Sequence, residues 1–427
     1  MRYVVVLLLL AAGVFSKKKD FTGHRLVSVT ARNKAELELL HGLETDASYE
    51  EIDFWSEPSL VRPTSIRVSP TDYGSIRTFL VKNHMQFEVK NENIQRSIDV
   101  EDEQLTRSSK ATSCDISSAY CTYDQIRTYL LGLPAKYPGQ VTVTSIGVTY
   151  EYREILAVTV SANLAVPKEK SVWVEAGSHS REWIAIASGL NLIEKLLTTT
   201  PGTEMLSEYD WNIVPLHNPD GYVQTHVADR FHRKNRQPRN GRCTIKPGGS
   251  MGIDLNRNWD IDWGRTGTDP SCSGTTYGGD GPFEAFETQA LRNAVLHDKA
   301  TRTVEAFFSV HAFSELLLLP YAYTSTKPAD YARLKETGEV MMKYLETTRG
   351  TYYVIGTPPD ILYAASGGSY DYFYVQGIPY SYCYELSPKT GGVESFIVNP
   401  AYIPDVSDEL FRSLWAFAMY VNNKLSA

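Results

Sequence analysis

Alternating and helical patterns of apolar residues divide the chain into a short first region and a longer second one. Within residues 24–90, HRLVSVTA alternates like a strand, KAELELLHGLE has helical spacing and TSIRVS alternates again. DYGSIRTFLVKNH then predicts a second helix and QFEVK a last strand. This order fits a β-α-β-β-α-β unit, a small sheet with two helices.

Residues 91–113, NENIQRSIDVEDEQLTRSSKATS, are polar and charged and show no apolar periodicity. We interpret them as an exposed linker, and exposed linkers are where proteolysis concentrates. The candidate cleavage sites are Arg96, Arg107 and Lys110. A folded region, a cleavable basic linker and a longer folded region together suggest a zymogen.

In the longer region, strand ends coincide with potential metal ligands. SVWVEAG reads as a strand of a sheet covered on both faces, and the helical pattern of WIAIASGLNLIEKLL follows it. His179 and Glu182 of HSREW therefore lie where ligands bind in open α/β sheets. VEAFFSVHAF brings His311 to a comparable place, and two histidines with one carboxylate are a ligand set of catalytic zinc.

Sequence spacing cannot prove that these three residues meet, because residues 182 and 311 lie far apart. Glu385 is a second unusual residue, since a glutamate inside the apolar run SYCYEL is costly unless it is paired or functional. The remaining histidines are expected to be surface or satisfied core residues: His24, His41, His84, His217, His226, His232 and His297.

Composition limits the class of protein. A chain of 427 residues predicts two domains, and 42% hydrophobic with 22% charged residues excludes a disordered chain or a membrane bundle. The net charge of −8 gives no reason to expect nucleic acid or an anionic membrane as a partner. MRYVVVLLLLAAGVFS has the features of a signal peptide cleaved after Ser16 and is too short to span a bilayer. The protein is therefore expected to be secreted.

A secreted chain can form disulfides, and this one has five cysteines. The odd number leaves at least one thiol free or paired with another chain, and Cys383 in its apolar strand is the favoured free one. Cys243 and Cys272 flank a glycine-rich stretch, and we pair them. Whether Cys114 pairs with Cys121 is left open.

From about Tyr123 onward the chain resembles the zinc metallocarboxypeptidases of the pancreatic carboxypeptidase A/B family. The resemblance rests on motifs in the same order: HSREW, NPDGY, RFHRK, GIDLNRNW, SVHAFSELLLLPY, ILYAASGGSYDY and YELSPKTG. Residues 24–90 resemble the family's propeptide less specifically. The resemblance implies an α/β catalytic domain at 111–427, with a mixed central β-sheet and helices on both faces. A signal peptide (1–16) and a propeptide (17–110) would precede it, the latter an α+β ferredoxin-like domain plus the linker.

The resemblance also implies roles for individual residues. His179, Glu182 and His311 match the ligands of one Zn²⁺ per chain, and Asp254 matches the carboxylate that holds a ligand histidine. Glu385 matches the general base that activates water.

The remaining roles concern the substrate. Arg233 matches the residue that polarises the scissile carbonyl, and Arg181 a subsite arginine. Asn256 and Arg257 match the clamp on the terminal carboxylate, and Tyr363 the tyrosine that closes over it.

The chain departs from the family pattern beside the site. Ala312 and Phe313 stand where a serine and a tyrosine are usual, which predicts an altered subsite rather than inactivity. Tyr370 matches the floor of the pocket for the C-terminal side chain and carries no charge, while Asp371 should point elsewhere. The matching walls are Leu318, Ala322, Pro358 and Cys383.

This pocket predicts a carboxypeptidase A-like preference for apolar C-terminal residues, with Asp360 as a nearby carboxylate that could change it. The alternatives are a basic or other C-terminal specificity, a catalytically silent secreted binding protein, or a regulatory carboxypeptidase, against which the propeptide argues. The expected partners are peptide and protein C-termini and an activating trypsin-like protease. We expect a monomer.

Overall fold

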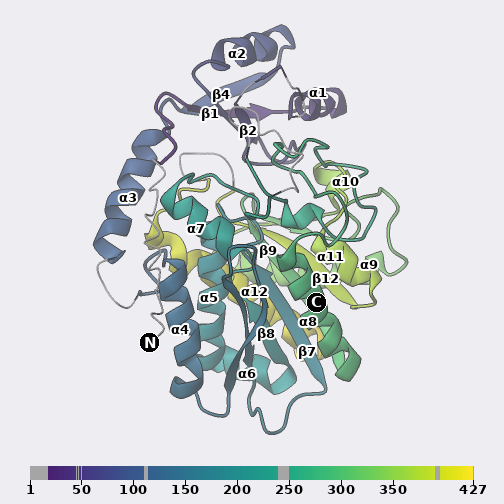
Figure 1. The fold of residues 1–427 in the computed structure, drawn as a ribbon. Coiled ribbons are helices and arrows are strands. Elements are labelled where there is room, and N and C mark those ends of the chain that lie inside the picture. Colours follow the sequence, from purple (N-terminus) through teal and green to yellow (C-terminus); the bar gives the residue numbers. More distant parts are fainter. Residues whose placement is uncertain are drawn as a thin grey trace, which may run out of the picture.

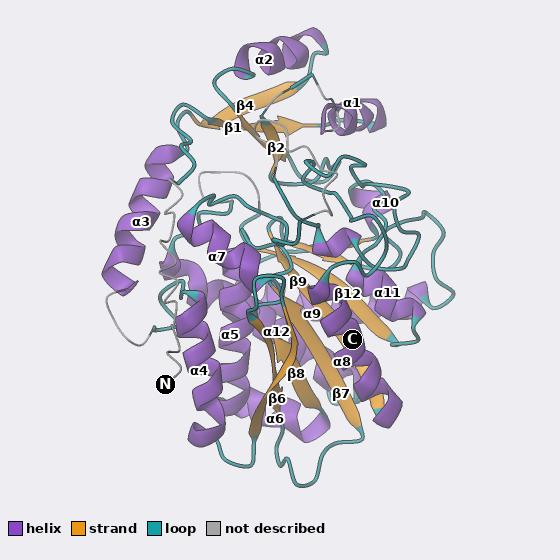
Figure 2. Ribbon diagram, viewed as in Figure 1, coloured by secondary structure: helices purple, strands orange, loops and turns teal. Residues whose placement is uncertain are grey.

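Two β-sheets organise the molecule, a small one above a large one (Figure 1, Figure 2). The structure is a computed structural model that describes residues 18–44, 46, 48–49, 51–109, 114–238, 250–389 and 395–426. The proposed signal peptide, Lys110 and Cys243 lie outside the described residues.

The small domain has the predicted element order. Its elements are β1 (Arg25–Thr30), α1 (Lys34–Glu44), β2 (Ile52–Phe54), β3 (Thr64–Val68), α2 (Tyr73–Lys82) and β4 (Gln86–Asn91). The strands pair antiparallel in the order β2-β3-β1-β4, as in a ferredoxin-like sheet. Val27 and Val29 of β1 pack with Leu40 and Leu80 of the two helices, so the apolar alternation seen in the sequence forms this core.

The segment interpreted as an exposed linker is helical, which corrects the sequence analysis. It forms α3 (Gln95–Ser109), drawn beside the large domain in Figure 1. Ile94 and Ile98 are buried in the core of the large domain, and Glu101 is buried in an ion pair with Arg230. The helical spacing of residues 94, 98 and 101 was hidden because the buried stripe is narrow and contains a charge whose partner is distant in sequence.

The large domain is built on an eight-stranded mixed sheet in the order β11-β10-β12-β9-β7-β8-β6-β5. Its strands are β5 (Val141–Val148), β6 (Glu154–Val160), β7 (Lys170–Ala176), β8 (Asp210–Val214), β9 (Thr303–Ala312), β10 (Leu316–Leu318), β11 (Val354–Gly356) and β12 (Tyr380–Leu386). The four central strands, β12, β9, β7 and β8, run parallel, so their carboxyl ends share one edge.

Helices cover both faces of this sheet, as predicted. One face of the sheet carries Val172, Val174 and Phe308. The helices in the same core cluster are α4 (Tyr123–Lys136), α5 (Trp183–Thr198), α6 (Thr200–Glu208), α7 (Pro219–Val227), α9 (Tyr331–Arg349) and α12 (Ile403–Val421). Trp173 and Phe307 point to the opposite face, where α8 (Phe286–Thr301) and α11 (Ser369–Val375) pack. Short helices are α10 (Pro358–Ile361), η1 (Leu255–Arg257) and η2 (Pro400–Tyr402). Because successive side chains of a strand alternate between faces, a continuous apolar run serves both layers.

The cysteines follow the sequence analysis where the structure describes them. Cys114 and Cys121 form a disulfide, which answers the question left open above. Cys272 is disulfide-bonded, and Cys383 is free and buried. In the described part of the chain, no helix combines the length and apolar character needed to cross a membrane.

The small domain docks over the edge of the large sheet where the parallel strands end (Figure 1). Trp55 is buried there, with its ring 4.5 Å from that of Phe231 and 5.2 Å from that of Phe396. The Phe21 ring lies 4.9 Å from that of Phe231 on the same surface. Aromatic contacts therefore anchor the small domain directly above the predicted site.

Candidate active site

Three adjacent parallel strands carry the central residues of the site. His179 and Glu182 follow β7, His311 lies near the end of β9, and Glu385 lies near the end of β12, directly opposite His311 in register. Gly177 starts the turn after β7 with φ of +74°, and a Cβ atom there would lie 2.8 Å from Ile186 of α5. A glycine is thus needed for the chain to turn from strand to helix with His179 and Glu182 facing the site.

The structure brings together His179, Glu182 and His311, all buried. Their facing atoms form a triangle: His179 Nδ1 is 2.8 Å from Glu182 Oε1, and His311 Nδ1 is 3.0 Å from both His179 Nδ1 and Glu182 Oε2. Tetrahedral zinc with bonds of about 2.0–2.1 Å requires donor atoms roughly 3.3 Å apart. Two ring nitrogens and a carboxylate in this arrangement fit zinc, and within the described ranges this is the one such group of three metal-binding side chains.

Asp254 orients the first histidine. Its Oδ1 accepts from His179 Nε2 at 3.0 Å, which leaves Nδ1 of that ring for the metal. Its Oδ2 accepts from Arg233 Nε at 3.0 Å. Burial alone would raise the pKa of Asp254, but the charges of Arg233 and His179 hold it well below its ordinary value. Asp254 is therefore an ionised partner for both residues.

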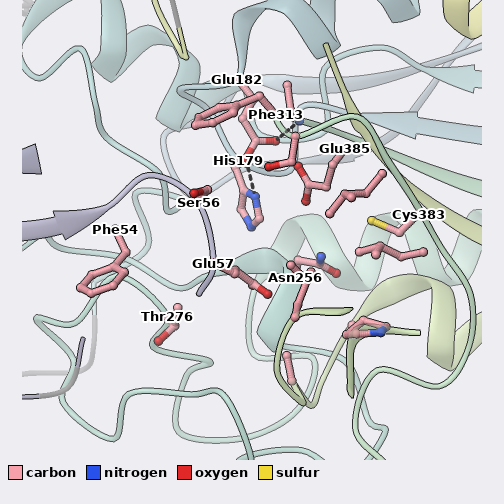
Figure 3. A pocket seen from close by; sticks show the side chains of 18 of the residues that line it. Phe54, Ser56, Glu57, His179, Glu182, Asn256, Thr276, Phe313, Cys383 and Glu385 are labelled. Atoms are coloured by element: carbon pink, nitrogen blue, oxygen red, sulfur yellow. Dashed lines mark hydrogen bonds and ion pairs between the residues drawn. The ribbon is translucent and has the colours of Figure 1, made fainter. Parts of the chain in front are cut away.

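Glu385 lines the same cavity, and no hydrogen bond or ion pair ties it to another side chain in the described part of the structure. Burial raises its pKa to about 8 without a bound metal, although the charge of His311 opposes that shift. Figure 3 shows Glu385 across the cavity from His179 and Glu182, with Cys383 of the same strand beside it. A carboxylate of this kind is placed to exchange a proton with a group bound between it and the triad.

Three of the residues expected from the sequence to bind substrate are held by the small domain. Arg257 Nη2 donates to Glu57 Oε1 at 2.7 Å. Tyr363 Oη donates to Glu44 Oε2 at 3.2 Å.

Arg181 Nη1 donates to both carboxylate oxygens of Asp53 at 2.9 Å, and its Nη2 donates to the Phe54 carbonyl at 3.0 Å. Three residues predicted to bind substrate are thus bound to carboxylates of the small domain. Sequence reasoning did not identify these carboxylates. No sequence signal distinguishes these carboxylates, because they lie on α1, on β2 and in the loop that follows it.

One cavity continues from the triad to the predicted specificity pocket. Its lining includes the proposed floor, Tyr370, and the proposed walls, Leu318, Ala322, Pro358 and Cys383. The Tyr370 side chain is buried, and its hydroxyl has no hydrogen-bond partner among the described residues.

The two neighbouring aspartates lie outside this pocket. Asp371 is not among the lining residues and accepts from the backbone N–H of Ala322 at 2.7 Å. Asp360 does not line the cavity and instead pairs with Lys327 at 2.5 Å. Neither aspartate is among the residues that line the cavity.

Glu175 is a further buried carboxylate that the sequence analysis did not single out. It lies on β7 with no exposed surface and is hydrogen-bonded to Ser178 and Ser309. The signal that drew attention to Glu385, a glutamate within an apolar strand, is also present in SVWVEAG and could have found it.

The sheet and its buried triad are those of a zinc-dependent hydrolase. The sequence model of the family described as "Zinc carboxypeptidase" matches residues 126–413, and that of the "Carboxypeptidase activation peptide" matches residues 27–101. The chain belongs to the zinc carboxypeptidase family and is made as a zymogen.

Relatives match along nearly the whole chain. It is 31% identical to zinc carboxypeptidase A 1 of Drosophila melanogaster (99% of this chain, 97% of the relative) and 30% identical to carboxypeptidase A1 of Mus musculus (97% of each). The crystal structure of a carboxypeptidase A from Helicoverpa armigera matches with a TM-score of 0.84 at 27% identity (93% of this chain, 97% of the other). These similarities confirm the predicted family, fold and zinc cofactor.

Proposed function

We propose that this chain is the precursor of a secreted, monomeric exopeptidase that removes neutral, apolar residues from peptide C-termini. One observation carries the exopeptidase assignment. Arg257, buried next to the metal triad, holds the carboxylate of Glu57 at 2.7 Å in the same cavity. A planar carboxylate is what a guanidinium binds best, so the site that now holds Glu57 suits the terminal carboxylate of a peptide.

The proposed mechanism assigns each step to a residue of the cavity. The terminal carboxylate exchanges for Glu57 at Arg257, with Asn256 beside it and Tyr363 closing over it. A zinc ion held by His179, Glu182 and His311 would supply Lewis acidity to the scissile carbonyl and to the attacking water. Glu385 takes a proton from that water and returns it to the leaving amine. Arg233, held by Asp254, donates to the oxygen on which negative charge develops.

Specificity is assigned to the pocket at Tyr370. A lysine or arginine side chain would be buried there without a counter-ion, at a cost of several kcal/mol. That cost corresponds to about two or more powers of ten in kcat/KM. Apolar side chains gain roughly 0.8 kcal/mol per buried methylene. The bulk of Tyr370 limits this gain for the largest side chains. We therefore expect aliphatic or modest aromatic C-terminal residues to be cleaved best, and basic and acidic ones poorly.

Activation is assigned to a trypsin-like protease that cuts at Arg107 or Lys110. Arg96 is disfavoured because it lies in the first turn of α3, between the buried residues Ile94 and Ile98. Such backbone has to unfold before a protease can bind it. Cleavage beyond Glu101 would leave the Arg230 contact in place, so release of the propeptide is a separate step after the cut.

The test is hydrolysis of N-blocked dipeptides with different C-terminal residues, before and after trypsin treatment. We expect activity after the cut, the stated order of residues, and no hydrolysis of dipeptide amides, which lack the carboxylate. Glu385→Gln should lower kcat by about 10²–10⁴ while zinc content stays at one per chain. The matched control is Glu305→Gln, on the neighbouring strand β9. Glu305 is paired with Lys170 at 3.0 Å, and this variant should keep wild-type activity. Equal cleavage of the amides would refute the exopeptidase assignment, and a Glu385→Gln variant within tenfold of wild type would refute the proposed base.

A further inference from the structure

The two histidines of the triad are held in different ways on the side away from the metal. His179 donates directly to the carboxylate of Asp254. Among the described residues, no carboxylate is hydrogen-bonded to His311 Nε2, which instead lies 3.0 Å from Ser309 Oγ. Ser309 Oγ in turn lies 2.8 Å from Oε2 of the buried Glu175. His311 is thus connected to a carboxylate through one intervening hydroxyl.

The direction of these hydrogen bonds follows from the chemistry of the groups. When Nδ1 of His311 binds zinc, its Nε2 must carry the ring proton and donate it. Ser309 Oγ is then the acceptor, and its own proton is free to go to Glu175. Asn256 Nδ2, 3.4 Å from the same ring nitrogen, is an amide donor and does not compete as an acceptor.

The other carboxylate oxygen of Glu175 has a charged neighbour. Ser178 Oγ lies 2.6 Å from Glu175 Oε1 and 2.9 Å from His217 Nδ1. Because the Ser178 proton goes to the carboxylate, His217 Nδ1 must donate to Ser178. His217 Nε2 lies 2.9 Å from the Glu287 carbonyl, which can only accept. Both ring nitrogens are therefore protonated, and His217 is a cation.

The charges agree with this assignment. Burial by itself would raise the pKa of Glu175, but the hydrogen bond and charge of His217 outweigh it and lower that pKa to about 2. Burial would lower the pKa of His217, and Glu175 raises it above its ordinary value instead. Neither residue has exposed surface, and each is the other's counter-ion at 3.4 Å.

We propose that Glu175 is a positioning residue for zinc: through Ser309 it orients His311 and fixes its tautomer, while His217 keeps Glu175 ionised. The inference rests on His311 being a zinc ligand. An ionised acceptor behind Ser309 makes its oxygen a stronger acceptor for His311, because hydrogen bonds in series polarise one another. Partners of this kind typically change metal affinity by 10–100-fold.

Two variants separate the charge from the hydrogen bonds. Glu175→Gln can keep every contact: the amide oxygen accepts from Ser309, the amide N–H donates to Ser178, and Ser178 donates to a neutral His217. Only the two charges of the Glu175–His217 pair are lost, so a merely structural role would leave zinc affinity unchanged. Ser309→Ala removes the connection itself. The matched control is Ser171→Ala, which removes a serine-to-carboxylate bond of 2.6 Å from the buried Ser171 to the partly buried Asp298, at the other end of β7.

The measurement is zinc affinity of the full-length chain by competition with a chelator, supported by the absorption spectrum of the cobalt-substituted chain. We expect about 10–100-fold weaker zinc binding for Ser309→Ala, roughly tenfold weaker for Glu175→Gln, and wild-type affinity for Ser171→Ala. The double variant should bind no more weakly than Ser309→Ala alone, because both changes act along one path.

Zinc affinity within twofold of wild type for both single variants would overturn the proposal, as would losses that multiply in the double variant. If His311→Ala kept stoichiometric zinc, the ligand assignment itself would be wrong. That outcome is distinct from a failure of the Glu175 connection.

Discussion

Removing the Asp53 carboxylate is expected to raise the basal peptidase activity of the uncut zymogen. Asp53 of the small domain makes two hydrogen bonds of 2.9 Å to Arg181, and only 1% of the Arg181 surface is exposed. In Asp53→Ala the docked state would keep this guanidinium buried with the Phe54 carbonyl as its remaining acceptor. In the undocked state water would solvate the same group, so the substitution favours undocking.

The size of the effect follows from the burial of the pair. Removing one partner of a buried ion pair costs about 3–5 kcal/mol. At about 1.4 kcal/mol per factor of ten, the population of undocked zymogen should rise by two to nearly four powers of ten. The ion pair of Glu57 with Arg257 should contribute less, because the Glu57 side chain is 31% exposed and therefore better screened.

The assay is hydrolysis of an N-blocked dipeptide by the intact chain, with gel analysis to show that it stays uncut. We expect Asp53→Ala to raise the basal rate about a hundredfold or more, up to the rate of the activated enzyme. Asp53 also accepts from Trp55 Nε1 at 3.1 Å, so Asp53→Asn, which keeps the volume and one acceptor, should give a smaller rise. Glu92→Gln is the matched control, since it breaks an ion pair with Arg25 inside the small domain whose carboxylate is 71% exposed.

The control should leave the basal rate within about threefold of wild type, as surface ion pairs contribute little. An Asp53→Ala zymogen that unfolds like wild type and hydrolyses no faster would refute the reasoning. An equal rise in the basal rate of Glu92→Gln would also refute it, because the effect would then come from the stability of the small domain rather than from its docking.

Three further predictions concern the metal, the pocket and pH. His311→Ala should no longer hold one zinc per chain after dialysis, as measured by metal analysis, because only two of the three protein ligands remain. Undiminished zinc affinity would contradict the assignment. Tyr370→Asp should raise kcat/KM for C-terminal lysine or arginine relative to leucine by at least about tenfold, since it adds a counter-ion; an unchanged ranking would place specificity elsewhere. Burial would raise the pKa of Asp53, but Arg181 and Arg67 lower it. Its contribution to docking is therefore present above the ordinary carboxyl pKa of about 3.9 and lost as pH falls through the lowered value. Size-exclusion chromatography of the cut chain should show faster release of the propeptide below about pH 4, and Asp53→Asn should flatten that dependence.

Local patterns were sufficient for much of the architecture. The alternation of HRLVSVTA and the helical spacing of KAELELLHGLE correspond to β1 and α1, because each element buries one face against a core close in sequence. α3 was missed for the opposite reason. Its buried face contacts the large domain, and Glu101 is compatible with burial only because Arg230 lies 2.5 Å away.

The candidate site shows the same division. His179 and Glu182 are three residues apart at the end of one strand, so the sequence alone places them together. Strand order brings His311 to them, since β9 is the neighbour of β7 in the sheet. Glu175 could have been suspected from its apolar surroundings, whereas its connection through Ser309 depends on that same strand pairing.

The sequence by itself determined the family, the two-domain order, the zinc ligand types and the neutral residue proposed for the pocket floor. These are properties of residue identity and short spacing. Only the tertiary structure decided which carboxylates of the small domain hold the residues proposed to bind substrate. Asp53 reaches Arg181 across 128 positions and Glu57 reaches Arg257 across 200. Ion pairs between distant positions leave no periodic signal, because they depend on where two separately folded surfaces meet and how deeply that contact removes the charges from water.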